Sequence, residues 1–420
     1  MTAPRLPSTA DPADLVYRAG SPFVRLAALL DGVRPAKDPL VMAVGEPKHP
    51  QPEFVAPVLN EALSGFSNYP AITGSETFRK AVADWATRRY ALATPLDPLK
   101  NVLTANGSRE ALAFAAVAAV ERARARLGRK RPALLLPNPF YQGYVGGALM
   151  AGADAFFQDG AFPDPLALDA ETRDRLAAIY VASPANPQGT VMDRDGWLRL
   201  IDFARDHDVM LFADECYSEL YGQTPPTGLL EAADESGHFD GLVSFNSLSK
   251  RSNLPGLRVG FMIGDADFLA LSARLRNMAA PQVPLPLQAV AAAVLADEAH
   301  VADNRRRYEE KWTMADAILA PVAGYCRAEA GFFLWLEIGG DDAAFVRDLY
   351  AEEGLRILPG SYCAVPLAHL PAERQPGAGH IRIALVESPD ITREGLTRLL
   401  AALRRHRPAL FAAPSSDRTS

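Results

Sequence analysis

The sequence predicts an α/β protein in which a large domain around a mostly parallel sheet is joined to a smaller α+β domain. From about residue 75 to 290, short runs that are apolar on both sides alternate with amphipathic helical patterns. Such alternation is typical of a parallel sheet with helices on both faces. A long charged helical pattern then leads into further strand-like runs. The chain has 420 residues, 49% of them hydrophobic, which is enough for two domains.

The strands of the large sheet are expected where four or five mostly apolar residues follow one another. They are Asn101–Ala105, Ala133–Pro137, Ala178–Ala182, Val209–Ala213, Leu242–Phe245 and Gly260–Ile263. Helical patterns separate most of them, at Ser75–Tyr90, Ser108–Leu127 and Arg194–His207. Ligands bind such sheets at the carboxyl ends of the strands. Asn186, Asp214 and Ser247–Lys250 each follow an apolar strand, so we expect a site there.

The smaller domain is expected around the helical pattern Asp297–Leu319, which could connect the two domains. Its strands are predicted at Gly331–Ile338, Leu355–Leu358 and His380–Val386. We therefore expect a large domain over residues 48–295 and a small domain formed by both termini, residues 1–47 and 296–410. The tail, residues 411–420, contains proline and serine and is expected to be disordered.

Composition excludes several classes of protein. The net charge is −7, which argues against nucleic acid as a partner. The three cysteines are widely spaced, so neither a disulfide framework nor a metal site is indicated. No secretory signal is visible at the N-terminus, and the apolar stretch Ala111–Val120 is about half the length of a membrane span. We expect a soluble cytoplasmic protein that acts on small molecules.

The string Ser247–Phe261 is the most informative feature. Lys250 lies between the hydroxyl residues Ser249 and Ser252, close to Ser247, and Arg258 follows eight positions later. Pyridoxal phosphate needs such a set, because its aldehyde forms a Schiff base with a lysine and its phosphate needs hydroxyl and guanidinium donors. The alternative for such a string is a surface loop with a solvated lysine.

Two further positions suit the ring of that cofactor. Asp214 closes an apolar strand, where its carboxylate could keep the pyridine nitrogen protonated, although an ordinary helix N-cap is the alternative. Tyr217 and Asn186 could each donate to the ring oxygen, while Asn-Pro is otherwise a common turn pair. Tyr141 could stack on the ring face, or could be a core residue.

The phosphate is expected at a helix N-terminus. Gly107 permits a tight turn into a long helical pattern, whose first N–H groups would point at the anion. Ser108 adds a hydroxyl and could equally be a plain N-cap. Arg258 can offer a bidentate pair, and Ser247 another donor. For a substrate carboxylate, we expect Arg382 and the backbone of the turn at Gly45.

In this order the motifs resemble the class I/II pyridoxal-phosphate aminotransferases of the aspartate aminotransferase fold, fold type I, over roughly Ala19 to Arg404. Several strings more narrowly resemble bacterial N-succinyldiaminopimelate aminotransferases. They are VGEPKHPQPEF, NGSREALAF, PNPFYQGY, DECYSELY, SLSKRSNLPGLRVGF, DNRRRYEEK and LPGSY. The sequence departs from that narrower pattern at Gln188, where threonine is usual, and over Arg276–Leu287.

The resemblance implies a seven-stranded large sheet and a role for each matching residue. Lys250 would form the Schiff base, Asp214 would pair with the pyridine nitrogen, and Arg109 would hold phosphate through its backbone. Tyr69 would reach the phosphate of the neighbouring subunit in a homodimer with shared active sites. The implied reaction is ping-pong transamination from glutamate in the succinylated branch of lysine and diaminopimelate synthesis.

Some alternatives stay open at this point. Another class I/II aminotransferase, using aspartate, aromatic or other donors, or a lyase with the same cofactor, would keep the same residues. A non-catalytic regulator is disfavoured by the complete catalytic set. Arg276 is a candidate for a distal substrate carboxylate, or else a solvated helix arginine. The segment Ser21–Leu30 is a candidate lid.

Overall fold

A seven-stranded sheet forms the centre of the computed structural model, which describes residues 21–125 and 127–411. Its order is β2 (Val102–Ala105), β8 (Gly260–Gly264), β7 (Leu242–Ser247), β6 (Met210–Asp214), β5 (Leu176–Ala182), β3 (Ala133–Asn138) and β4 (Asp154–Asp159). All neighbours are parallel except β8, which runs antiparallel to both β2 and β7. The predicted mostly parallel, seven-stranded sheet is confirmed.

Alternate strand residues pack into two separate cores, because successive side chains of a strand point to opposite faces. Leu134 and Leu136 of β3 join one core and Leu135 joins the other. The first core is covered by α5 (Ser108–Ala125), α6 (Gln142–Ala151) and α11 (Ala266–Ala279). The second is covered by α4 (Glu76–Arg89), α8 (Arg194–Asp206), α9 (Leu229–Ala233) and α12 (Leu285–Ala296). The sheet therefore has helices on both faces, as predicted.

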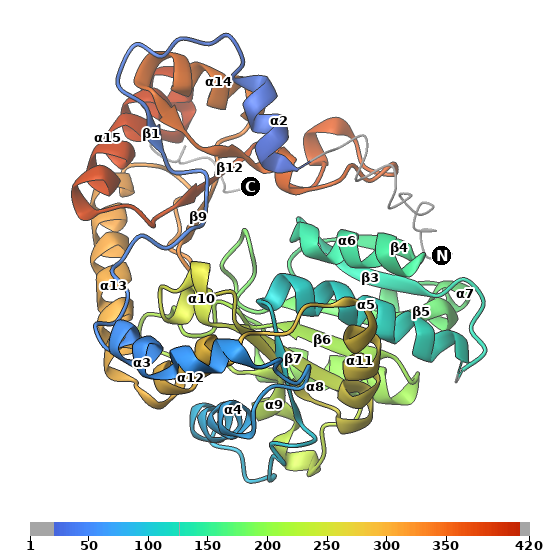
Figure 1. The fold of residues 1–420 in the computed structure, drawn as a ribbon. Coiled ribbons are helices and arrows are strands. Elements are labelled where there is room, and N and C mark those ends of the chain that lie inside the picture. The colour runs from blue at the N-terminus through green and yellow to red at the C-terminus, as the bar shows by residue number, and fades with distance from the viewer. Residues whose placement is uncertain (1–20, 126, 412–420) are drawn as a thin grey trace.

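Two small sheets lie apart from the large one. β9 (Phe333–Glu337), β11 (Leu358–Pro359) and β12 (His380–Ala384) form an antiparallel sheet, and β1 (Leu40–Val41) pairs with β10 (Leu355–Arg356). A third core joins them to α2 (Pro22–Leu29), α13 (Ala299–Leu319), α14 (Asp342–Glu353) and α15 (Pro389–His406). Figure 1 shows this group above the large sheet, with α13 running from one to the other.

Helix ends follow the capping residues of the sequence. The Ser75 hydroxyl accepts from the Phe78 N–H at 3.3 Å and starts α4, and the Asp193 carboxylate accepts from the Gly196 N–H at 2.7 Å and starts α8. These side chains satisfy N–H groups that have no partner within the helix. The predicted limits of both helices agree with the structure to within one residue.

Three elements differ from the prediction. The expected strand Leu355–Leu358 is split, because Leu355 pairs with Leu40 while Leu358 pairs with Arg382 in another sheet. β4 was not predicted, since its sequence DAFFQD begins and ends with polar residues. Phe411, assigned to the disordered tail, ends a 3-10 turn (Pro408–Phe411); residues 412–420 lie outside the described part. The domain limits at 47/48 and 295/296 remain our proposal.

The remaining helices are short, and they include α3 (Val55–Ala62), α7 (Ala170–Arg175) and α10 (Leu248–Arg251). Over residues 21–125 and 127–411, no helix combines the length and apolarity that a membrane crossing requires. The same part of the chain contains no cluster of three or more metal-ligating side chains.

Candidate active site

A cavity of about 220 Å³ lies at the carboxyl ends of β5, β6 and β7. It is also lined by residues of α2, β9 and β12, so both the large and the small sheets contribute to it. Nine residues predicted from the sequence line this cavity: Gly45, Ser108, Arg109, Tyr141, Asn186, Asp214, Tyr217, Lys250 and Arg382. Chain segments separated by up to 337 residues are thus brought to one place, as the position of the strand ends predicts.

Lys250 lies in α10, the four-residue helix that follows β7 directly. Its Nζ donates to the Gly45 carbonyl at 2.5 Å and lies 5.5 Å from the centre of the Phe332 ring. Burial lowers the pKa of Lys250 to about 8, and the positive charges of Arg258 and Arg382 act in the same direction. At pH 7 roughly a tenth of the amine is then neutral, and about half at pH 8, which supplies the form that a nucleophile and general base requires.

Asp214 is a buried carboxylate at the end of β6. Its Oδ2 accepts from Tyr144 Oη at 2.9 Å, and its Oδ1 accepts from the Cys216 N–H at 3.3 Å. Burial raises the pKa of Asp214, and these hydrogen bonds oppose that rise. No ion pair joins this carboxylate to another described residue. A cation in the cavity, such as a protonated ring nitrogen, would be its natural partner.

The turn before α5 has the features of a phosphate site. Gly107 has φ +78°, a backbone conformation that favours glycine, and a side chain there would displace the Arg258 guanidinium. Ser108 starts α5, whose first N–H groups face the same region. Arg258 is exposed and donates to the Pro255 carbonyl at 3.0 Å. A helix N-terminus, a hydroxyl and a guanidinium together suit a phosphate dianion.

Ser247 and Ser249 lie beside this turn but do not line the cavity. The Ser247 hydroxyl accepts from the Ser249 N–H at 3.2 Å and caps α10, and it also bonds to the Ser249 hydroxyl at 2.9 Å. Both serines are buried. In this arrangement they hold the helix that carries Lys250, and their role as phosphate ligands remains a prediction.

Arg382 lies on β12 and is buried. Its two Nη groups donate to Asn186 Oδ1 at 3.1 Å and to the Ala43 carbonyl at 3.0 Å, and the guanidinium lies 4.3 Å from the centre of the Phe333 ring. Its Nε is buried and has no partner among the described residues. A buried arginine without a carboxylate beside it leaves capacity for an anionic ligand.

Three aromatic and polar side chains complete the wall. Tyr141 Oη accepts from Arg109 Nε at 2.6 Å. The Tyr217 ring packs edge-on against Phe332 and Phe333, at 5.4 and 5.8 Å between centres. Burial raises the pKa of Tyr217 well above its usual value, so its hydroxyl stays protonated and can donate.

The structure also corrects and extends the predicted set. Arg276 cannot serve a substrate, because it is fully buried and bound to Glu110 at 2.9 Å. Tyr69 lies outside the cavity and is 98% exposed in the single chain. Tyr144 was missed, although it lies three residues after Tyr141, in the first turn of the helix that begins after Tyr141; a second tyrosine so close in sequence was the available signal. The cavity wall also includes Pro22 and Phe23 of the candidate lid, and members that were not predicted: Val44, Phe140, Gln142, Ala182, Cys216, Phe333 and Cys363.

These residues fit pyridoxal phosphate. An amine of lowered pKa, a buried carboxylate without a cationic partner and a helix N-terminus beside an arginine match its aldehyde, ring nitrogen and phosphate respectively. No single side chain carries this fit. The combination does, with Lys250, Asp214 and Ser108 in the cavity wall and Arg258 outside the lining, close to Gly107.

Comparisons with known proteins agree. The sequence model of aminotransferase class I and II matches residues 37–403. An LL-diaminopimelate aminotransferase of Syntrophobacter fumaroxidans is 30% identical over 376 residues, which cover 86% of this chain and 90% of that protein.

Among solved structures, an aminotransferase of Neisseria meningitidis superposes with a TM-score of 0.84 at 35% identity, covering 91% of this chain and 97% of its own. A probable N-succinyldiaminopimelate aminotransferase of Thermus thermophilus superposes with a TM-score of 0.78 at 26% identity, covering 91% and 100%. The chain therefore belongs to the class I and II aminotransferases, which depend on pyridoxal 5′-phosphate.

Proposed function

We propose that the protein is an N-succinyl-LL-2,6-diaminopimelate:2-oxoglutarate aminotransferase of lysine and diaminopimelate synthesis. The charge of the cavity wall is the observation that carries this proposal. Its described lining includes Arg109 and Arg382 as cationic residues besides the partly neutral Lys250, and Asp214 as the sole carboxylate. Since Asp214 lies at the end of β6 and serves the cofactor ring, the wall left to the substrate is cationic. A substrate with several carboxylates suits it.

The same observation separates two related substrates. LL-diaminopimelate, named for the Syntrophobacter relative, carries an ammonium group at its distal end. That group would call for a carboxylate in the substrate part of the wall, and the described lining offers none there. Succinylation turns the distal amine into an amide and adds a carboxylate. We therefore favour the succinylated substrate, with Arg109, an exposed residue of the cavity wall, as the one that could meet its distal anions.

The cofactor, when bound, withdraws electrons from the substrate Cα and so weakens its C–H bond. The neutral Nζ of Lys250 takes the Cα proton as general base. Asp214 would hold a proton on the ring nitrogen of that cofactor, and Tyr217 and Asn186 would donate to its ring oxygen. Tyr141 would stack on the ring.

The remaining predicted residues bind and orient. Gly107, Ser108, the Arg109 backbone, Ser247, Ser249 and Arg258 are proposed to hold the phosphate. Arg382 is proposed to bind the substrate α-carboxylate as a bidentate pair, with the backbone at Gly45 and the Asn186 amide beside it. The candidate lid Ser21–Leu30 includes Pro22 and Phe23, which line the cavity, and closure of α2 would exclude water from it.

We also propose a homodimer with shared active sites. Tyr69 is 98% exposed in the single chain, and Leu63, Phe66 and Met278 are 48%, 56% and 76% exposed. Exposed apolar side chains of this size mark interaction surfaces. A second subunit covering them would bring its own Tyr69 to the phosphate region of the first.

A half-reaction screen tests the substrate assignment. Protein loaded with pyridoxal phosphate is mixed with single amino donors, and the absorbance of the bound cofactor is followed. Conversion by glutamate, reversed by N-succinyl-2-amino-6-oxopimelate but not by oxaloacetate, is the expected result. Faster conversion by free LL-diaminopimelate, aspartate or aromatic donors would be consistent with the family and the mechanism but would refute the succinylated substrate.

A further inference from the structure

The strings GEPKHP and DNRRRYEEK, which lie 255 residues apart, meet in the structure. His49 Nδ1 and Asn304 Oδ1 are 2.8 Å apart. His49 belongs to the loop that begins at Gly45, and Asn304 lies near the start of α13. Neither residue lines the cavity, so neither is explained by contact with the cofactor or the substrate.

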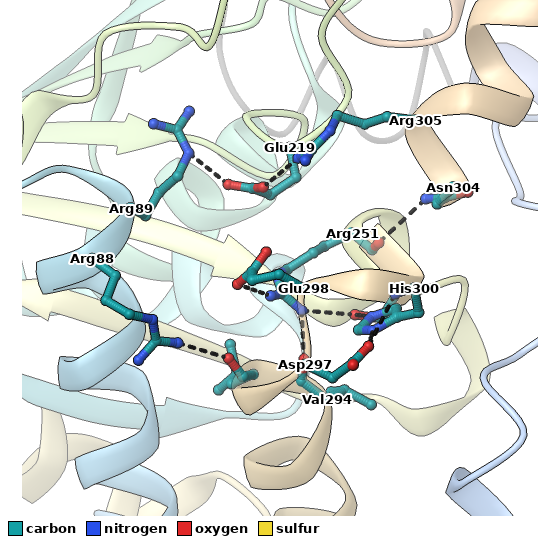
Figure 2. A network of polar contacts seen from close by, with 12 residues as sticks. Arg88, Arg89, Glu219, Arg251, Val294, Asp297, Glu298, His300, Asn304 and Arg305 are labelled. Atoms are coloured by element: carbon teal, nitrogen blue, oxygen red, sulfur yellow. Dashed lines mark hydrogen bonds and ion pairs between the residues drawn. The ribbon is translucent and has the colours of Figure 1, made fainter. Parts of the chain in front are cut away.

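Asn304 contacts the backbone that carries Lys250. Its Nδ2 donates to the carbonyl oxygens of Lys250 and Arg251, at 3.1 and 3.2 Å, and its side chain is 1% exposed. Figure 2 shows Asn304 directed from α13 towards Arg251. Both carbonyls belong to α10, a four-residue helix whose carbonyl groups have few partners within the helix. Asn304 therefore supplies the hydrogen bonds that fix this short helix.

The donors and acceptors of the Asn304 contacts follow from the groups that Asn304 faces. Two carbonyl oxygens can only accept, so the NH₂ group of Asn304 must face them and its oxygen must face His49. His49 Nδ1 then carries the proton. Burial lowers the pKa of His49 to about 4, and the positive charges of Lys311 and Arg307 act in the same direction. At any pH well above 4 the imidazole of His49 is therefore neutral, keeps one N–H and donates it to Asn304.

The neighbouring residues are held from the same side. Arg251 donates to the Val294 carbonyl and to Glu298, both at 2.7 Å (Figure 2). His300 Nε2 lies 2.9 Å from the Ser252 hydroxyl. These contacts anchor the backbone after Lys250 to the end of α12 and the start of α13. Of these contacts to the backbone around Lys250, Asn304 alone also makes a hydrogen bond to a residue of the loop 45–49.

That loop also contacts the reactive end of Lys250, through the 2.5 Å hydrogen bond from Nζ to the Gly45 carbonyl. The backbone carbonyl of Lys250 and its amine are thus joined to one loop by two routes. A shift of the loop relative to α10 would move the amine within the cavity. The His49–Asn304 pair opposes such a shift.

We propose that His49 and Asn304 are positioning residues for Lys250, which hold α10 in register with the loop 45–49 and so set where the amine lies. The inference rests on the proposed role of Lys250. A displacement of the amine by a fraction of an ångström changes its distance from Arg382, Arg258 and the cavity wall. Its reactivity therefore changes even where the fold is intact.

The test measures Lys250 in the full chain without cofactor. Competitive labelling of lysines with an acylating reagent, read by mass spectrometry across pH 6 to 11, gives the apparent pKa of Lys250. The variants are His49→Ala, His49→Asn, Asn304→Asp and the double variant His49→Ala/Asn304→Asp. Asparagine at position 49 can place an N–H where histidine Nδ1 lies. Arg306→Gln, an exposed change on the same helix, is the matched control.

We expect His49→Ala and Asn304→Asp to shift the labelling pKa of Lys250, while His49→Asn and Arg306→Gln leave it unchanged. In the loaded enzyme the same two variants should lose about 10- to 100-fold in kcat with little change in KM, because Arg382 is untouched. The double variant should lose no more than the worse single one, since both break one chain of contacts.

Two outcomes overturn the proposal. One is an unchanged Lys250 pKa in variants that remain folded, as judged by thermal unfolding. The other is additive losses in the double variant. If Asn304→Asp does not fold, the difference in Lys250 pKa between His49→Ala and His49→Asn still tests the proposal. Failure of the function proposed for Lys250 is distinguishable, since it would show as activity retained in Lys250→Ala.

Discussion

Arg382 donates to the amide oxygen of Asn186 across 3.1 Å and thereby joins β12 of the small sheet to the loop that follows β5 of the large one. The two residues lie 196 positions apart. Both are proposed to face the same substrate carboxylate. The bond between them means that the site forms only when the two sheets stand in one relative position, so substrate binding and the packing of the sheets are coupled.

Replacing Lys250 by alanine removes the amine that is proposed to move the Cα proton. We expect turnover to fall by at least about 10³-fold, because general-base catalysis and covalent attachment of the cofactor are both lost. The absorbance of the bound cofactor should change to that of a non-covalent complex. Lys100→Ala, at an exposed lysine, is the control. Full turnover in Lys250→Ala would refute the assignment.

Replacing Arg382 by lysine keeps the charge but removes the planar pair of donors. We expect kcat/KM for amino acids to fall about 100-fold, mainly through KM. A primary amine without a carboxylate gives the control reaction, and its slow conversion should be unaffected. Equal losses with both substrates would show that Arg382 supports the fold rather than the carboxylate.

Replacing Tyr144 by phenylalanine removes the 2.9 Å hydrogen bond to Asp214 Oδ2. The carboxylate then loses a donor, its pKa rises further, and it holds the ring nitrogen less firmly. We expect a loss of about 10-fold in kcat. Tyr180→Phe is a matched control, because Tyr180 is also buried but donates to the Leu112 carbonyl at 2.8 Å. Equal effects in the two variants would contradict a specific role for Tyr144.

Replacing Lys311 by methionine tests the cost of a buried amine. Lys311 is 1% exposed, its Nζ has no hydrogen-bond partner among the described residues and lies 5.1 Å from the centre of the Tyr308 ring, and burial lowers its pKa to about 8. Because the unfolded chain binds the proton more tightly, the wild type should gain stability as pH rises from about 8 to 10.5. We expect the variant to be more stable by about 1–3 kcal/mol at pH 7.

The stability gain of Lys311→Met should shrink as pH rises from about 8 to 10.5 and be smallest above 10.5. Denaturant unfolding at pH 7, 9 and 10.5 measures it. A gain independent of pH would show that packing, and not the amine, sets the difference. A loss at pH 7 would show that Lys311 has a partner that stabilises its charge.

Mixed dimers test whether active sites are shared. Lys250→Ala and Tyr69→Ala subunits, each of low activity alone, are unfolded together and refolded. In a hybrid dimer, one site combines Lys250 of one subunit with Tyr69 of the other. We expect roughly a quarter of wild-type activity after mixing. A mixture no more active than its components would exclude a shared site at Tyr69.

Much of the fold could be predicted because the apolar strands carry their signal locally. β5 is apolar throughout and β6 is apolar up to Asp214, and α8 between them begins at the capping residue Asp193. β4 could not be predicted, because its sequence begins and ends with polar residues and lacks the apolar run of the other strands. Its pairing with β3 stabilises it. The split of Leu355–Leu358 between two sheets was likewise a matter of tertiary pairing.

The candidate site divides in the same way. Lys250, Asp214 and the turn at Gly107 could be found because each stands directly after a strand or before a helix, where chain order and chemistry agree. Arg276 could not be judged from sequence. Whether an arginine faces a substrate or a buried glutamate depends on what lies across from it, and here Glu110 does.

The sequence by itself determined the alternation of the apolar strands and the helices of the large domain, the residues that suit pyridoxal phosphate and the family to which the chain belongs. Only the tertiary structure decided which of these residues share a cavity and which partners they have. The reason is physical: backbone periodicity and capping act over a few residues, whereas burial, charge and hydrogen bonding act between side chains hundreds of positions apart. The His49–Asn304–Lys250 contacts belong wholly to the second kind.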